Sequence, residues 1–397
     1  MFFSDLISHK LGAMLTACLM VFPMACAEEI PAGKLKPVTT AEIDAAVKRG
    51  IDFLVVDQNS NGSWGSATHT KDINIYAPLP GAHHAYRAGA SGLALSGLID
   101  SADKRPSTIA SIEKASAWME ENLPKLRRAD QTTTYNIWGH AYGTRALTRL
   151  YLRENDALKK ARYKALAQEQ INLVNRYEDI NGGFGYLDVF DGFTSKRPTG
   201  ITTSFGSATV LLAMKEASDT MACTLDKKVV GTSLDSIKRQ QFPDKSYAYS
   251  HEHIMRPRLP INRPAGSLAR SQACNAALRA YGREGISDDV ITEWADRFLA
   301  REGWLSIARK RPMPHDIHFQ ISGYFYYYGI YYFTESARFL PPEKQKQYAQ
   351  ELATLILSKQ EKDGSWWDYP LYDYHQPYGT GYALMALAWC KSAMLDH

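Results

Sequence analysis

The hydrophobic positions along the chain fall into two kinds of segment that alternate. Six segments carry apolar residues at spacings of three and four with a charged opposite face, which is typical of amphipathic helices. These segments span 40–56, 109–123, 157–176, 234–241, 287–301 and 343–359. Between them lie six glycine- and alanine-rich segments that are apolar nearly all round, which indicates buried helices. These span 85–98, 140–152, 202–214, 263–278, 326–339 and 376–390.

The buried segments are copies of one another. Each holds one glycine that aligns with the others, and these glycines recur every 50 to 63 residues, at Gly89, Gly143, Gly206, Gly266, Gly329 and Gly379. A repeat of this length indicates one supersecondary unit that stacks on its neighbours. Six buried helices, each paired with an amphipathic one, predict an all-α fold: an (α/α)6 toroid, a barrel of six helical hairpins. We expect a single domain over residues 28–397.

A turn motif ends the first amphipathic segment. In the stretch RGIDFLVVDQNSNGSWG, residues 49–65, Gln58 is followed by Gly62 and then Trp64. The same spacing recurs in QEKDGSW at 360–366, and a degraded copy, NGGF, lies at 181–184. We interpret the motif as structural. Gly62 supplies a tight turn, Trp64 packs back on the helix, and the Gln58 amide satisfies backbone groups at helix ends.

These residues resemble the QW repeat of terpenoid cyclases. The resemblance extends over 40–395 and implies the toroid of squalene-hopene cyclases and protein prenyltransferase β subunits; a class of pectate lyases is similar. Their functional residues do not carry over. The chain has Asp288-Asp289 but no DxDD acid motif, it has no Asp-x-Cys zinc pair, and Thr202 to Phe205 stand where the lyases have an Asn-Asp pair. The resemblance therefore implies the fold and leaves the chemistry open.

The N-terminus indicates export. Residues 11–27 read LGAMLTACLMVFPMACA after Lys10, which is typical of a secretory signal peptide cleaved after Ala27. We expect a periplasmic or secreted protein. A lipoprotein modified at Cys26 is an alternative that Pro23 disfavours, and a buried N-terminal helix is another. No later stretch reaches the roughly 18 uninterrupted apolar residues of a membrane span, so we expect no transmembrane helix after signal removal.

Net charge and cysteine content restrict the kinds of partner and metal site that the sequence supports. The net charge of +4 and the lack of a basic run with interleaved aromatics argue against a nucleic-acid partner. Beyond the leader, Cys223, Cys274 and Cys390 give no disulfide framework and no zinc spacing, and the sequence does not decide whether any two pair. It identifies no cofactor.

Histidines gather at one end of the predicted ring. Eight of the eleven lie just before a buried segment or at its start: His83, His84, His140, His251, His253, His315, His318 and His375. Because all inner helices run the same way, these loops meet at one mouth, where helix N-termini add positive potential. We predict a ligand pocket there. Spacings such as that of His251 and His253 could bind a metal ion, but they are common, and we do not predict a metal site.

The repeat alignment selects the candidate site residues. His140 and His375 lie three and four residues before aligned glycines, and Tyr142 and Tyr378 lie one before, so we assign these four as catalytic acid–base groups. The predicted substrate-binding residues are Arg197, Arg263, His84, Asp373 and Tyr374. The alternative is structural: the His–Tyr pairs cap inner helices, and each of the two arginines, which precede prolines, belongs to a helix entry.

The residue types favour a sugar. Arginine suits carboxylates, while tyrosine and histidine suit proton transfer. We therefore expect a carbohydrate-active enzyme, a lyase or hydrolase of acidic polysaccharide. The alternatives are an isoprenoid-handling enzyme, cyclase-like or prenyltransferase-like, and a non-catalytic toroid that binds protein or cell wall. An apolar cavity with one buried aspartate would favour the isoprenoid. A groove lined by His, Tyr and Arg would favour the sugar, and outward-facing histidines around a plugged axis would favour the binder.

Overall fold

The computed structural model describes residues 36–71, 81–126, 136–185 and 202–395. They belong to one compact unit, Pro31–His397. The predicted leader at 1–27 and Arg197 lie outside the described residues. Within them there is no strand beyond two isolated β-bridges, and no described helix is both long and apolar enough to cross a membrane.

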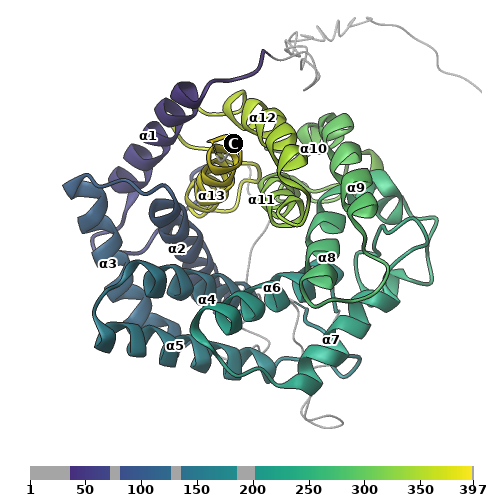
Figure 1. Ribbon diagram of the computed structural model, residues 1–397, viewed down its shortest axis with the longest axis horizontal. Helices are drawn as coiled ribbons and strands as arrows, with labels where there is room; N and C mark the ends of the chain where they lie inside the picture. Colours follow the sequence, from purple (N-terminus) through teal and green to yellow (C-terminus); the bar gives the residue numbers. More distant parts are fainter. Residues whose placement is uncertain (1–35, 72–80, 127–135, 186–201, 396–397) are drawn as a thin grey trace, which may run out of the picture. The chain divides into compact units, whose positions relative to one another are not determined.

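The helices of this unit form two concentric rings (Figure 1). The inner ring consists of α2 (Ala82–Asp100), α4 (Asn136–Arg153), α6 (Ser204–Met221), α8 (Leu268–Ala280), α11 (Phe325–Ala337) and α13 (His375–Leu395). The outer ring consists of α1 (Thr40–Asp57), α3 (Pro106–Asn122), α5 (Ala157–Asn175), α7 (Lys227–Arg239), α9 (Asp288–Ala300) and α12 (Pro342–Leu357). The predicted (α/α)6 toroid is confirmed, with every predicted inner segment in the inner ring.

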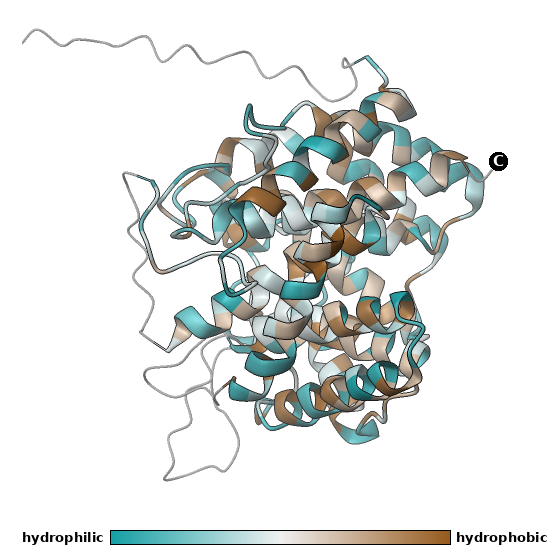
Figure 2. Ribbon diagram, turned by 90° about the vertical axis from the view of Figure 1, so that its left-hand side faces the viewer, coloured by the Kyte–Doolittle hydropathy of each residue, from teal (hydrophilic) through white to brown (hydrophobic). Residues whose placement is uncertain are grey.

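Shorter helices lie between these elements. They are α10 (Glu302–Ala308) and the 3₁₀ turns η2 (Leu123–Lys125), η3 (His251–His253), η4 (Pro260–Asn262), η5 (Pro264–Ser267) and η6 (His318–Gln320). Figure 2 shows hydrophilic loops on one side of the rings, and helices in which hydrophilic and hydrophobic segments alternate. The long connections therefore carry much of the polar chain at one end of the barrel.

Two helices begin five or more residues away from their predicted starts, and α6 and α13 extend to Met221 and Leu395, beyond the predicted ends at 214 and 390. Helix α7 begins at Lys227, seven residues before the expected start at 234, because the Asp226 carboxylate accepts hydrogen bonds from the first backbone amides of the helix and caps it. Helix α8 begins at Leu268 rather than at 263, because the chain first forms the 3₁₀ turn that starts at Pro264. The helix α10 was not predicted.

Small residues set the close approach of inner helices. A Cβ added to Gly381 on α13 would lie 2.5 Å from the carbonyl oxygen of Leu93 on α2, which is closer than van der Waals contact allows. The first and last hairpins also meet through the Gln360 side chain, whose amide donates to the Ala46 carbonyl at 2.8 Å. The ring is therefore closed by backbone packing and by a polar contact of the repeated turn motif.

The turn at 58–64 has the structural role predicted for it. Gly62 has φ +93°, a conformation that favours glycine. The Gln58 amide donates to the carbonyls of Gly62 at 3.0 Å and Ser111 at 2.9 Å. Trp64 is fully buried, and its indole N–H donates to the Leu54 carbonyl at 2.8 Å. The motif thus joins the end of one outer helix to the next outer helix.

Within the described residues the same turn occurs four times. In each copy the backbone N–H of a buried aromatic residue donates to a hydroxyl on, or just before, the following inner helix. The donor–acceptor pairs are Trp64–Ser91, Phe184–Ser207, Tyr247–Ser267 and Trp366–Thr380, at 2.8 to 3.0 Å. Sequence inspection missed the third copy, because Lys245 takes the left-handed position that glycine holds elsewhere, with φ +62°.

Candidate functional site: an aromatic cavity at the mouth of the inner ring

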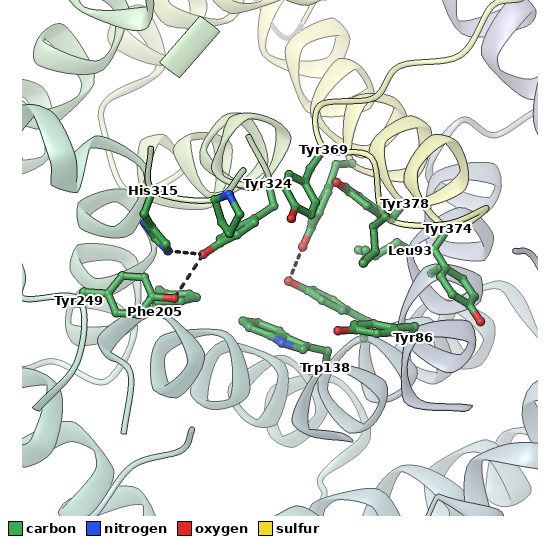
Figure 3. Close-up of a pocket in the computed structure, with 16 residues that line it drawn as sticks. Tyr86, Leu93, Trp138, Phe205, Tyr249, His315, Tyr324, Tyr369, Tyr374 and Tyr378 are labelled. Atoms are coloured by element: carbon green, nitrogen blue, oxygen red, sulfur yellow. Dashed lines mark hydrogen bonds between the residues drawn. The ribbon is translucent and has the colours of Figure 1, made fainter. Parts of the chain in front are cut away.

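A cavity of about 320 Å³ opens at the N-terminal end of the inner helices. Its lining comes from α2, α4, α6, α13 and the loops before α8, α11 and α13 (Figure 3). The lining residues are Tyr86, Gly89, Ala90, Leu93, Trp138, Tyr142, Phe205, Tyr249, Pro314, His315, Tyr324, Tyr369, Leu371, Tyr374, Tyr378 and Tyr382. Eight tyrosines and no Asp, Glu, Lys or Arg stand among them, so the described lining is aromatic and uncharged.

One wall is a row of aromatic rings. The indole of Trp138 is stacked with Tyr142 at 6.0 Å between ring centroids and an interplanar angle of 10°, and with Phe205 at 6.0 Å and 22°. All three residues lie in the first two turns of α4 and α6. Such rings offer flat apolar faces, against which the apolar face of a ligand packs.

A chain of hydrogen bonds adjoins this row at Phe205, whose ring centre lies 5.3 Å from that of Tyr249. His315 Nδ1 lies 2.7 Å from the Gln320 carbonyl oxygen, and the Tyr324 hydroxyl lies 3.0 Å from His315 Nε2. The Tyr249 hydroxyl lies 3.2 Å from that of Tyr324 (Figure 3). Because a carbonyl only accepts, Nδ1 carries the proton, and Nε2 of the neutral ring accepts from Tyr324. The direction of the chain is thus fixed: Tyr249 donates to Tyr324, and Tyr324 donates to His315. We name these three residues the relay.

The relay loop has an uncommon backbone. His315, Phe319 and Gln320 have φ values of +61°, +67° and +52°, in the left-handed region that non-glycine residues seldom adopt. The His315 amide donates to the Ser322 hydroxyl at 3.0 Å, which ties the loop to the start of α11. Backbone conformations of this kind cost free energy and cluster at functional sites, so the loop is a candidate for function rather than a passive connection.

A second titratable pair lies behind Tyr378. The Tyr378 hydroxyl donates to one oxygen of Asp368, and the Tyr327 amide donates to the other at 2.9 Å. Asp368 is fully buried. Burial raises the pKa of this carboxyl to about 6, against the opposite effect of its hydrogen bonds. Tyr378 therefore lines the cavity while its hydroxyl proton is engaged by a buried carboxylate.

The axis is filled beyond the cavity. The Tyr382 hydroxyl donates to that of Tyr142. Farther along, the buried Arg145 contacts the Tyr331 hydroxyl and pairs with Glu335 at 2.9 Å. Arg149 pairs with Asp100 and with Glu216, both at 2.9 Å. These ion pairs link α2, α4, α6 and α11, and they close the end of the axis away from the mouth.

The predicted site residues divide into two groups. Tyr142, Tyr378 and Tyr374 line the cavity. His140 and His375 do not: His140 Nδ1 lies 2.8 Å from Gln170 of the outer helix α5, and His375 Nδ1 lies 2.6 Å from the Tyr372 carbonyl. Burial lowers the pKa of both imidazoles to about 4. The structure therefore does not bring these histidines together with the tyrosines at one cavity.

Helix geometry explains the difference. Residues three and four positions apart share one face of a helix, whereas a neighbouring residue lies about 100° away. The aligned Gly143 and Gly379 face outward, since an added Cβ would meet Leu123 and the Trp366 carbonyl oxygen respectively. His140, three residues before Gly143, shares that outward face, while Tyr142, one residue before it, faces the axis. The repeat alignment therefore identified the correct helix but placed His140 on the wrong face of it.

The remaining predicted residues also lie off the cavity. His84 is half-buried, with Nε2 3.2 Å from the Asn122 carbonyl. Asp373 accepts from the Ser66 hydroxyl at 3.0 Å, and Arg263 is exposed at the start of η5. Among the residues that the structure describes, no three His, Cys, Asp or Glu side chains are placed to hold a metal ion.

Sequence reasoning missed most of the relay and of the aromatic wall. His315 was counted at the mouth without a role, and Tyr249, Trp138 and Phe205 were not singled out. One signal was available: the residue before the aligned glycine is aromatic at Tyr142, Phe205, Tyr328 and Tyr378. Phe205 shares the position of Tyr142, so the alignment already marked it as facing the axis.

Fold and site together define an α/α-toroid protein with an aromatic ligand cavity. The fold is similar to that of a cellobiose 2-epimerase from Spirochaeta thermophila, with a TM-score of 0.56, 13% identity, and coverage of 89% of this chain and 98% of that chain. An α-1,6-mannanase of Salegentibacter, solved with α-1,6-mannotetrose, gives 0.52 and 10%, covering 88% and 98%. The type II terpene cyclase MstE from Scytonema gives 0.47 and 12%, covering 90% and 100%.

No family model and no curated protein matches the chain. At such low identities the similarity to the epimerase and the mannanase establishes the fold alone. The chemistry has to be argued from the cavity.

Proposed function

We propose that this protein is a carbohydrate-active enzyme that removes a proton from a sugar carbon next to a carbonyl or carboxylate group. The relay carries the proposal. Its neutral His315 accepts a proton through Tyr324 and Tyr249, whose hydroxyl is the outermost of the chain. Burial lowers the pKa of His315, so the ring is unprotonated and able to accept at neutral pH.

The aromatic wall supports a sugar ring as the bound group. A pyranose has apolar C–H faces that pack on rings such as Trp138 and Phe205, and ligand sites in general are mostly apolar with few polar groups. The cavity volume of about 320 Å³ lies at the low end of ligand sites, which range over roughly 300–1,000 Å³. A small number of sugar units fits this space better than a long stretch of polymer.

The cavity favours elimination or isomerisation over hydrolysis. Glycoside hydrolysis usually needs two carboxyl groups at the scissile bond, and no carboxylate stands in the described lining. Asp368 reaches the cavity only through Tyr378. Of the two reactions expected from the sequence, the lyase is therefore the one we propose. Isomerisation at a reducing end begins with the same step as the lyase reaction, the removal of a proton from a carbon next to a carbonyl group.

A second candidate follows from the lining itself. Tyrosine hydroxyls pair with one another and with Asp368, which leaves ring faces toward the ligand, and a single aspartate is buried behind them. This fits an isoprenoid. Asp368 is, however, a poor acid for an alkene, because both its oxygens accept hydrogen bonds and its pKa is about 6. We therefore place the isoprenoid second.

The test is a screen with two kinds of sugar. With acidic polysaccharides, the assay measures the formation of unsaturated ends. With neutral reducing sugars, it measures the exchange of the C2 proton for deuterium in deuterated water. His315→Gln and Tyr324→Phe should each lower an observed rate by about a hundredfold or more. The control is His84→Gln, at the same mouth but off the cavity. If the wild type is active and His315→Gln stays within about tenfold of it, the proposal is wrong. If a polyprenol raises the melting temperature of the protein and none of the sugars does, the result favours the second candidate.

A further inference from the structure

Arg270 is a buried cation without a carboxylate partner among the described residues. It lies on α8 with 1% of its surface exposed. Its guanidinium donates to three backbone carbonyls, those of Gly266 at 2.9 Å, Tyr247 at 3.2 Å and Ile261 at 2.6 Å. Its Nε has no hydrogen-bond partner. Burial is the main cause that lowers the pKa of Arg270, to about 10, so the group is still charged at neutral pH.

Such a group is costly to the fold. A buried charge is normally paired, because removing it from water is repaid only by an opposite charge with good geometry. In this protein the dipoles of the three carbonyl groups stabilise part of the buried charge, and the faces of two aromatic rings stabilise another part. The guanidinium carbon lies 5.5 Å from the ring centre of Tyr249 and 5.6 Å from that of Phe325. The cation therefore stands directly behind the first member of the relay.

Arg270 is also the main positive charge that acts on His315. The ring centres of His315 and Tyr249 are 5.2 Å apart, so the imidazole and the cation both lie within about 5.5 Å of the centre of one phenol ring. The other groups near His315 are Tyr324, which donates to it, and His253, which acts more weakly in the same direction as Arg270. Asp316, next in the chain, is exposed.

We propose that Arg270 is a positioning residue that acts through the relay: burial favours the neutral, proton-accepting form of His315, and the fixed charge of Arg270 adds to that preference. No described carboxylate cancels that charge, and the low-dielectric surroundings of α8 do not screen it as water would. The hydrogen bond from Nδ1 to the Gln320 carbonyl favours the protonated ring, so Arg270 opposes it.

The consequence for catalysis rests on the proposed function. When the substrate C–H bond breaks, its electron pair stays on the substrate as an enolate, and the proton passes to the Tyr249 oxygen. The Tyr249 proton moves to Tyr324, and the Tyr324 proton moves to Nε2 of His315. The enolate is negative and Arg270 is positive, so the cation stabilises the intermediate while it makes the imidazolium a better acid for the return of the proton. The same residue would thus set the acid limb of the pH profile.

The experiment measures the protonation of His315 without any substrate. Histidine is labelled at Cε1, and its NMR signal is followed from pH 4 to 9 in the full protein, with assignment from His315→Gln. In the wild type, His315 should titrate below the ordinary value of about 6.5. Arg270→Gln should raise its pKa by about one unit or more, the size expected for charges that lie at most about 11 Å apart at an effective dielectric constant of about 20. Arg270→Lys should keep it near the wild-type value.

The control is His84, whose nearby cations are Arg87 and Lys125; its pKa should be the same in wild type and in Arg270→Gln. An unchanged His315 in a folded Arg270→Gln protein, or an equal shift at His84, overturns the proposal. If Arg270→Gln does not fold, the wild-type titration still decides, because a His315 that titrates at or above 6.5 contradicts it. Since no turnover is measured, this outcome is separate from the sugar screen, which alone tests the proposed function.

Discussion

Replacing Trp64 with alanine tests the physical account of the turn. The indole is fully buried and packs where α1 ends and the chain turns inward. Truncating such a side chain typically costs about 3–5 kcal/mol. The indole also donates to the Leu54 carbonyl at 2.8 Å, a bond with a net contribution of about 1 kcal/mol. We therefore expect Trp64→Ala to lower the free energy of unfolding by an amount in the upper half of that range.

The measurement is urea unfolding followed by circular dichroism, with the change taken from the midpoint at unchanged slope. Trp304→Ala is the control, because Trp304 is 37% exposed and its loss should cost about 1 kcal/mol or less. Trp64→Phe separates the two contributions, since it keeps most of the buried ring and loses the N–H donor. If Trp64→Ala unfolds within about 1 kcal/mol of wild type, the structural interpretation of the motif is refuted.

Three further outcomes are expected. Gly62→Ala should destabilise strongly, since φ is +93° and a Cβ would meet the Lys114 carbonyl oxygen at 2.3 Å; the half-buried Gly231, where an added Cβ would meet no atom within 4 Å, is the control for urea unfolding. Arg145→Met should cost up to about 3–5 kcal/mol, because it removes the buried cation beside Glu335 and leaves that carboxylate only the half-exposed Arg338, whereas Arg162→Met, at a pair whose arginine is exposed, should cost at most about 1. Burial and the nearby Asp373 raise the pKa of Asp57 to about 7, above an unfolded value near ~3.9. Wild-type stability should therefore fall as pH rises from about 4 to 7, a slope that Asp57→Asn should remove.

The fold was predictable because its information is periodic. The glycine-rich inner segments and the Gln–Gly–Trp turn repeat at intervals that a single sequence displays, and each copy needs the same backbone geometry. Gly62, Gly182 and Gly364 all have positive φ in equivalent turns. Where the pattern was broken the prediction failed, as at Lys245, which takes the glycine position without being glycine, and at the start of α7, which depends on the cap at Asp226.

The site was less predictable because it depends on which side of a helix faces the axis. Counting back from the aligned glycine found Tyr142 and Tyr378 on the inner face, but the same counting placed His140 and His375 there, although they share the outward face of the glycine. His315 depends on tertiary structure altogether. Tyr324 is its hydrogen-bond partner, and Tyr249, which bonds Tyr324, lies 66 residues before His315 in the sequence, so no local pattern links the three.

The two ends of the axis differ in a way that determines how a ligand enters and leaves. Toward the C-terminal ends of the inner helices, Arg145 is 2% exposed and, with Arg149, ties α4 to α2, α6 and α11 through carboxylates. Breaking a buried pair of this kind is costly, so the contacts hold that end closed. At the other end the cavity wall is formed by single rings and by the relay loop. We therefore expect a ligand to enter and leave at the N-terminal mouth, where the described lining is made of aromatic rings rather than of buried ion pairs.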